Sequence, residues 1–294
     1  MGRGDAQHGV RDSVRGGEPV DVRLTRRGLL VGILTTATLS ACESAPGVTP
    51  TPTPSFDLPG DAPVAAWELT GGLSAAGIAA LRPPRLVVYG DGDAIADAAY
   101  RSRLDPGQLR ALAVALADDL RSTGAQKKPT IIPTIADAPV TKVSVWSPSG
   151  TLTFAAEGLD ELKADRLYAD VLYAARDRLA AVHKTVSATA QPYLATRVRV
   201  VAVPGLDGTA GSTGIDPVTA DPSASASTTA WPADVLLPAP DREGLRKADL
   251  DGDTARAAVR MLTRDLDQRG AWPVYRMPDG TVVRASWRYL LPHE

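Results

Sequence analysis

Three turn sequences, each lying between two strand-like segments, constrain the fold of this chain more than any other feature. They are Asp91-Gly92, residues 147–150 (Ser-Pro-Ser-Gly) and residues 277–280 (Met-Pro-Asp-Gly), and each contains a glycine that can adopt the positive φ of a tight turn. Apolar and polar residues alternate on both sides of 147–150, which is the pattern of half-buried strands. The sequence therefore predicts three β-hairpins and an antiparallel sheet.

Segments with helical spacing separate the hairpins. Asp105 can cap a helix that has Pro106 at its first position, and Gly124 is predicted to end this helix. Apolar residues at steps of three and four predict further helices over about 164–188 and 254–267. This alternation predicts the α+β fold class, with an antiparallel sheet built from β-hairpins and helices packed on one face.

The residues after 230 are too few to hold a core of their own. We therefore expect the last hairpin, about 273–290, to add strands to the same sheet. Trp231 follows a segment that lacks large apolar residues, so of the five tryptophans it is the one that we expect to be partly exposed. The inner face of the last hairpin is predicted to consist of Val283, Ala285, Trp287 and Tyr289.

Residues 1–41 have the pattern of a bacterial export signal. Arg26 and Arg27 precede an uncharged stretch, residues 28–42, which is too short and too rich in glycine and threonine to span a bilayer. The arginine pair, with two leucines shortly after it, resembles a twin-arginine export signal.

The uncharged stretch ends in Leu39, Ser40, Ala41 and Cys42, which resembles the lipobox of bacterial lipoproteins. The resemblance implies that residues 1–41 are removed as a signal peptide and that the Cys42 thiol carries a diacylglyceryl group. The alternative is an ordinary buried thiol in a short core helix, which the arginine pair, the small residues and the prolines that follow all disfavour. Since one acyl chain binds a membrane only marginally, stable attachment requires two or more chains.

The chain after the signal divides into a linker and a folded part. Residues 42–63 are interpreted as the lipidated cysteine and a Pro/Thr-rich linker, because alternating proline and threonine favour extended polyproline II. Residues 64–294 are predicted to form a single α+β domain. Within it, about 205–230 is poor in large apolar residues, which predicts a disordered insertion.

The sequence contains no G-x-S-x-G, S-x-x-K, G-x-G-x-x-G or G-x-x-x-x-G-K-[ST] motif. Residues 249–253 (Asp-Leu-Asp-Gly-Asp) suggest a calcium loop, but Lys247 and Ala258 would then occupy its first and last ligand positions. After signal removal only His183, His293 and one cysteine remain, too few for a structural zinc site. We therefore predict no catalytic residue, no metal site and no cofactor.

Three further segments are similar to uncharacterised secreted lipoproteins of actinobacteria. They are Val-Val-Tyr-Gly-Asp-Gly at 87–92, Ala-Asp-Ala-Pro at 136–139 and Leu-Leu-Pro-His-Glu at 290–294. The resemblance covers about 64–294. Because no activity is assigned to that family, it transfers no functional residue other than Cys42.

These observations lead to one main functional hypothesis and two alternatives. The main one is a non-catalytic binding or interaction module on the extracytoplasmic face of the cell membrane, anchored through Cys42 and contacting an unknown envelope protein or ligand. The net charge of −2 argues against a nucleic-acid partner. One alternative is an envelope hydrolase, which needs two acids facing each other across a cleft with raised pKa values. The other is a secreted-type protein inhibitor that presents residues 205–230.

Overall fold

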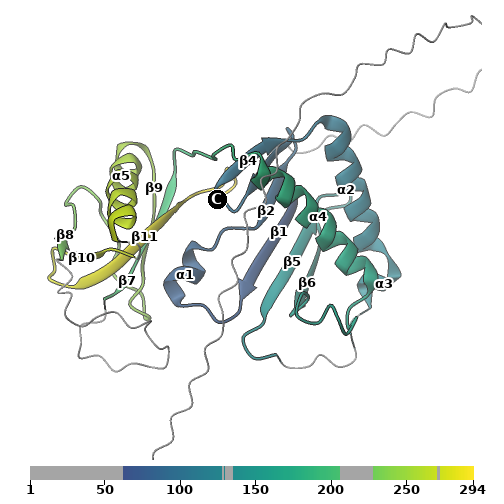
Figure 1. The fold of residues 1–294 in the computed structure, drawn as a ribbon, viewed down its shortest axis with the longest axis horizontal. Coiled ribbons are helices and arrows are strands. Elements are labelled where there is room, and N and C mark those ends of the chain that lie inside the picture. The colour runs from purple at the N-terminus through teal and green to yellow at the C-terminus, as the bar shows by residue number, and fades with distance from the viewer. Residues whose placement is uncertain (1–61, 128, 130–134, 206–227, 270–271) are drawn as a thin grey trace, which may run out of the picture. The chain divides into compact units, whose positions relative to one another are not determined.

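The computed structural model describes residues 62–127, 129, 135–205, 228–269 and 272–294 (Figure 1). All of these residues belong to one compact unit of the chain, Pro54–Glu294. They have the predicted α+β composition, with the strands arranged in two sheets. No helix in these ranges is both long enough and apolar enough to cross a membrane. The predicted signal peptide and lipidated cysteine, and nearly all of the linker and the insertion, lie outside the described residues.

The first sheet, sheet A, is antiparallel throughout and has the order β4-β3-β2-β1-β5-β6 in the described part of the chain. Two predicted hairpins, β2–β3 and β5–β6, lie in it and are confirmed. At the first hairpin turn Gly92 has a φ of +93°, and a Cβ there would lie 2.6 Å from the Leu104 carbonyl oxygen, so only glycine fits. The strands are β1 (Pro63–Gly71), β2 (Leu86–Tyr89), β3 (Asp93–Ala96), β4 (Tyr100–Arg103), β5 (Pro139–Val145) and β6 (Leu152–Glu157).

Helices α2 (Pro106–Arg121) and α4 (Asp170–Ala188) cover one face of sheet A (Figure 1). Their apolar sides and the facing strand residues form one buried cluster, in which Leu86, Leu116 and Leu179 have no exposed surface. Full burial of such a side chain contributes about 1.5–3 kcal/mol. This core holds the helices on one face of the sheet and leaves the opposite face available for other contacts.

The start of α2 follows the sequence prediction, whereas its end does not. The Asp105 carboxylate accepts a hydrogen bond from the Gln108 backbone N–H at 2.8 Å, and the Gln108 side chain accepts one from the Asp105 N–H at 3.1 Å. The helix ends before Gly124, because Ser122 is extended and its hydroxyl caps a further short helix, α3 (Thr123–Gln126).

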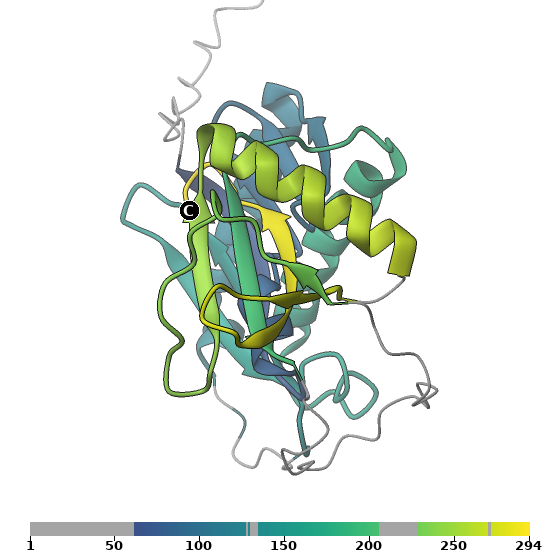
Figure 2. The same ribbon diagram turned by 90° about the vertical axis from the view of Figure 1, so that its left-hand side faces the viewer.

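The second sheet, sheet B, has the order β8-β10-β11-β7-β9 within the described residues, and only its β8–β10 pair is parallel. Helix α5 (Gly252–Arg269) lies across one of its faces (Figure 2). The third predicted hairpin, β10–β11, is confirmed. The strands are β7 (Val198–Pro204), β8 (Thr229–Ala230), β9 (Arg246–Leu250), β10 (Val274–Arg276) and β11 (Val282–Tyr289).

The expectation that the last hairpin extends sheet A is wrong. Strand β11 pairs along its length with β7, and both strands belong to sheet B. Ala258 and Leu262 of α5 share a buried cluster with Val200 and Ala285, so these strands have a core separate from that of sheet A. We expected the residues after 230 to be too few for a core of their own. They form one because β7, which precedes the insertion in the sequence, pairs with β11 and adds its valines to the core under α5.

Trp231 is buried, contrary to the prediction. Only 5% of its surface is exposed. Its indole N–H donates to the Val235 carbonyl at 2.6 Å, and its ring meets the Tyr275 ring edge-on with centroids 5.2 Å apart. Of the predicted inner-face residues, Val283 and Ala285 are buried, while Trp287 and Tyr289 are partly buried against the same cluster.

Helix α1 (Ala76–Leu81) lies between the two sheets (Figure 1) and contacts β7 and β11. Gly77 allows this close approach, because a Cβ there would lie 2.5 Å from Val203 Cγ1 and 3.1 Å from the Trp272 ring. A further buried cluster contains Tyr89 of β2 together with Leu291, which follows β11. The face of sheet A opposite α2 and α4 therefore packs against the segment that follows β11.

Candidate functional site

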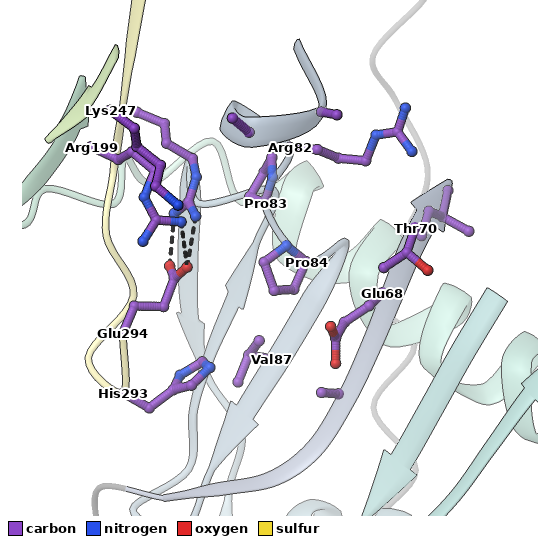
Figure 3. A pocket seen from close by; sticks show the side chains of 15 residues that line it. Glu68, Thr70, Arg82, Pro83, Pro84, Val87, Arg199, Lys247, His293 and Glu294 are labelled. Atoms are coloured by element: carbon purple, nitrogen blue, oxygen red, sulfur yellow. Dashed lines mark hydrogen bonds and ion pairs between the residues drawn. The ribbon is translucent and has the colours of Figure 1, made fainter. Parts of the chain in front are cut away.

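A cleft of about 340 Å³ opens between the two sheets beside α1. One wall comes from β1, α1 and the residues before β2, and the other from β7, β9, β11 and the C-terminal segment 290–294 (Figure 3). We call it the polar cleft, because its lining includes Glu68, Thr70, Arg82, Arg199, Lys247, Arg288, His293 and Glu294. Ionisable groups from segments far apart in the sequence thus share one concave surface, as in ligand sites.

A second cavity, of about 600 Å³, lies between α2, α3 and β6. Its lining includes apolar side chains such as Leu120 and Phe154. Lys127 and Pro129 line one side of it, and their sequence neighbours 128 and 130–134 lie outside the described residues. The surroundings of this second cavity are described only in part. The polar cleft is therefore the better candidate site.

Strand alternation and register bring three cations together on the sheet B wall of the polar cleft. Val198 and Val200 belong to the cluster under α5, so Arg199 between them points to the opposite face. Arg288 lies directly opposite Arg199 across the β11–β7 pair. Lys247 is the diagonal neighbour of Arg199 across the β7–β9 pair. Like charges so close destabilise a sheet unless acids compensate them.

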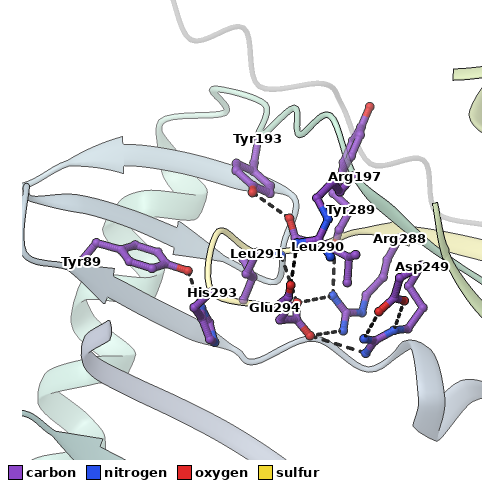
Figure 4. Close-up of polar contacts among 11 residues, drawn as sticks. Tyr89, Tyr193, Arg197, Asp249, Arg288, Tyr289, Leu290, Leu291, His293 and Glu294 are labelled. Atoms are coloured by element: carbon purple, nitrogen blue, oxygen red, sulfur yellow. Dashed lines mark hydrogen bonds and ion pairs between the residues drawn. The ribbon is translucent and has the colours of Figure 1, made fainter. Parts of the chain in front are cut away.

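Glu294 supplies much of that compensation (Figure 4). Its carboxylate accepts hydrogen bonds from both terminal nitrogens of Arg288, at 2.6 and 2.7 Å, and from the Leu291 backbone N–H at 3.0 Å. It also lies 3.5 Å from Arg199 Nη1. Burial alone would raise the pKa of Glu294, but these hydrogen bonds and positive charges outweigh it and hold the pKa below its ordinary value. Glu294 is therefore ionised near neutral pH.

Asp249 is the second acid on this wall. It lies opposite Arg199 in the β7–β9 pair and accepts two hydrogen bonds from that guanidinium, at 2.8 and 2.9 Å. The hydrogen bonds to Arg199 lower the pKa of Asp249, although partial burial opposes this shift. Its carboxylate thus has an arginine partner in the neighbouring strand. No group of three or more potential metal ligands occurs in the described ranges.

The C-terminal segment also places His293 in the polar cleft. Its Nδ1 lies 2.7 Å from the Tyr89 hydroxyl (Figure 4). Burial lowers the pKa of His293, so the imidazole is neutral near pH 7. Burial raises the pKa of Tyr89, so its hydroxyl keeps its proton. A neutral imidazole can accept that proton at Nδ1, in which case His293 carries its own proton on Nε2.

The opposite wall carries Glu68 and Arg82. The Glu68 carboxylate pairs with Lys142 of the neighbouring strand β5 at 3.2 Å. The Arg82 guanidinium donates to the Gly71 carbonyl at 2.7 Å. Within the described residues neither Arg82 nor Lys247 has an acidic partner. Two lining cations thus form no ion pair with a described residue.

The other histidine lies outside the polar cleft. His183 of α4 is partly buried, and its Nε2 lies 2.7 Å from the Asp97 carboxylate, which also pairs with Arg85 at 2.8 Å. The imidazole meets the Trp67 ring edge-on at 5.8 Å between centroids. His183 is thus packed and hydrogen-bonded on the helix-covered side of sheet A.

Sequence reasoning missed the residues that form the polar cleft. The alternation of arginine and valine in 197–203 predicts a strand with one charged face, but not which strands lie beside it. His293 was considered only as a zinc ligand and as part of the resemblance of residues 290–294, and Glu294 only as part of that resemblance. The residues predicted for export and lipidation, Arg26, Arg27, Leu39, Ser40, Ala41 and Cys42, lie outside the described residues.

The chain matches no protein-family model, no curated protein and no solved structure. We therefore infer the function from the polar cleft and from the sequence.

Proposed function

We propose that the protein is a lipid-anchored, extracytoplasmic binding module and that its ligand site is the polar cleft. The support for its location is the sequence: the arginine pair, the short uncharged stretch and the small residues before Cys42. The support for binding is the cleft itself, where charged side chains from both sheets surround an open volume of about 340 Å³.

The observation that carries the binding proposal is that contacts within the protein hold these side chains in place. Arg199 and Arg288 are each fixed by two charged hydrogen bonds to a carboxylate, and only 19% and 9% of their side chains are exposed. A wall that is already ordered loses little conformational entropy when a ligand arrives. The polar cleft is thus preorganised for recognition.

The hydrolase alternative has weaker support. Glu68 and Glu294 both line the polar cleft, as that mechanism requires. A general acid needs a raised pKa, however, and Arg288 and Arg199 lower that of Glu294. Glu294 is therefore a poor proton donor near neutral pH, and a binding role accounts better for its contacts.

Fatty-acid labelling tests the anchor. The full chain and the Cys42→Ala variant are expressed in an actinobacterial host supplied with an alkyne-bearing fatty acid. We expect label in the membrane fraction for the unaltered chain and none for Cys42→Ala. Ser44→Ala, a matched change two residues away, should keep the label. Label on Cys42→Ala would contradict the assignment.

A ligand panel tests the cleft. Thermal unfolding is measured with glycerol, inorganic phosphate, glycerol 3-phosphate, acetate, glycine and glucose. At least one compound should raise the unfolding midpoint, and Ala79→Trp, which fills the cleft from α1, should abolish the increase. Ala111→Trp, an equivalent change on the exposed side of α2, should leave it intact. A panel without any shift, or shifts that Ala79→Trp leaves unchanged, would count against the polar cleft as the ligand site.

A further inference from the structure

The polar cleft also carries information about the chemistry of its ligand, and this step rests on the function proposed above. We infer that the cleft binds a small molecule or headgroup that bears a phosphate monoester on a hydroxylated body, with the phosphate on the sheet B wall beside Lys247 and Arg199.

The charge of the lining favours a dianion. Four cations, Arg82, Arg199, Lys247 and Arg288, stand against Glu68 and Glu294 in the described lining, a net of +2 when His293 is neutral. Of the partners outside the lining, Asp249 and Lys142 carry opposite charges and cancel, and Arg197 donates to a main-chain oxygen of Glu294 at 2.6 Å. A phosphate monoester carries about −1.5 to −2 near pH 7, whereas a carboxylate carries −1.

Lys247 has the geometry of a phosphate contact. It projects from β9 on the same face as Arg199 of β7, and the two side chains lie together in Figure 3. Its ammonium has no acidic partner in the described part of the chain, although Asp249 lies two residues away on the same strand. Asp249 instead binds Arg199 through Nε and Nη2. Lys247 therefore keeps its donors for a ligand.

The neighbouring arginines can add donors to the same anion. Arg199 Nη1 has a contact to Glu294 at 3.5 Å, too long for a strong hydrogen bond, so its hydrogens remain available. Arg288 Nε is buried and has no hydrogen-bond partner among the described residues. A guanidinium presents five N–H groups and binds phosphate in a defined orientation. An oxyanion beside Lys247 and Arg199 Nη1 would satisfy donors that the described residues leave open, whereas the buried Arg288 Nε contributes only its positive charge.

The other side of the polar cleft suits a hydroxylated body. Thr70 and Glu68 of β1 and the neutral His293 offer acceptors and donors that match alcohol groups. Arg82, which Figure 3 places on the wall opposite Lys247, can contact the far end of such a molecule. A volume of about 340 Å³ lies at the small end of ligand sites, which suits a molecule of a few carbons.

Calorimetric titration with glycerol 3-phosphate tests the inference, with glycerol and acetate as the neutral and singly charged controls. We expect binding of glycerol 3-phosphate, at least tenfold weaker binding of acetate and no heat from glycerol. A second arm measures binding to vesicles of phosphatidylcholine with and without phosphatidic acid. Binding in either arm supports the inference, and the arm that responds identifies a soluble phosphate or a lipid headgroup as the source.

Matched variants assign the binding to the polar cleft. Lys247→Gln and Arg82→Gln should each weaken the responding probe about tenfold or more, because each removes a charged contact. Lys184→Gln, the same change on an exposed position of α4, should leave binding unchanged. Absence of phosphate binding in both arms, or binding that Lys247→Gln does not weaken, would overturn the inference. If glycerol or glucose then binds and Ala79→Trp blocks it, the proposed function survives and only the ligand class fails.

Discussion

Replacement of Glu294 by glutamine tests how the sheet B wall is held together. Its carboxylate connects Arg288 of β11 to Arg199 of β7, which lie directly opposite each other in the sheet. Glutamine has almost the same shape and keeps one acceptor oxygen, but it removes the negative charge. The two guanidiniums then face each other, with Asp249 as the remaining compensating acid.

The magnitude follows from burial. The Glu294 side chain is 17% exposed and that of Arg288 is 9% exposed, so solvent screens their interaction only in part. Breaking a fully buried pair costs about 3–5 kcal/mol. Because glutamine keeps one hydrogen bond and Asp249 still neutralises Arg199, we expect a smaller loss, of about 2 kcal/mol, for Glu294→Gln. For a folded part of this size, this loss corresponds to about 4–8 °C in the unfolding midpoint.

The dependence on pH gives a second readout. The pKa of Glu294 is lower in the folded chain than in the unfolded chain, where a glutamate titrates near pH 4.3. A lowered folded pKa stabilises the protein fully above the unfolded pKa, and the stabilisation is lost as pH falls through the folded pKa. The difference in stability between the unaltered chain and Glu294→Gln should therefore be largest near pH 7 and shrink below about pH 4.

Urea unfolding at pH 7, 5 and 3 measures this difference. Glu161→Gln is the matched control, because Glu161 is exposed and has no hydrogen bond or ion pair among the described residues. It should shift stability by less than about 0.5 kcal/mol. Equal effects of Glu294→Gln and Glu161→Gln, or a difference that grows as pH falls, would refute the assigned role of Glu294.

Three further substitutions test the fold by urea or thermal unfolding. Gly77→Ala should destabilise the protein by about 1–3 kcal/mol, because the new Cβ would overlap Val203 of sheet B. Gly124→Ala, where a Cβ has room, should be neutral or slightly stabilising, and equal effects of the two changes would contradict the close approach of α1. Asp105→Ala should cost about 1 kcal/mol through loss of the α2 cap, and a neutral result would show that the cap contributes little. Tyr275→Phe should cost about 1–3 kcal/mol, because it removes the buried 2.6 Å hydrogen bond to Asp265, and an unchanged midpoint would refute that cost.

Local features of the fold could be predicted from the sequence because their causes lie within a few residues. The hairpin turn at Asp91-Gly92 depends on one glycine with positive φ. The start of α2 depends on Asp105, Pro106 and Gln108, which are adjacent along the chain. Such signals need no knowledge of what lies across the molecule.

The division into two sheets could not be predicted, because it depends on long-range pairing. Strand β7 directs Val200 toward α5, and its other face carries the fully buried Val201 beside Arg199, so its apolar pattern is compatible with either sheet. Its neighbours, β9 and β11, come from residues more than 40 positions later. Long-range pairing also explains why Trp231 is buried, because the β8–β10 pair holds the residues just before it in sheet B.

The polar cleft escaped prediction for the same reason. Arg199, Lys247 and Arg288 look like separate solvated charges along the chain, and only the strand register makes them neighbours. The lowered pKa of Glu294 depends on these contacts. Composition could suggest that a charged strand face exists, but not that a second sheet faces it.

The separate cores of the two sheets have a thermodynamic consequence for any molecule that occupies the space between them. Sheet A packs against α2 and α4, and sheet B packs against α5. The two walls of the polar cleft therefore exist together only while the two sheets, each with its helices, are docked against each other. Occupancy and docking are then linked equilibria, and a ligand at a hundred times its dissociation constant would stabilise the docked form by about 2.7 kcal/mol. When ligand saturates the polar cleft, amide hydrogens where α1 contacts β7 would exchange more slowly with solvent. Amide hydrogens in the strands beneath α2 would exchange only through global unfolding of the protein.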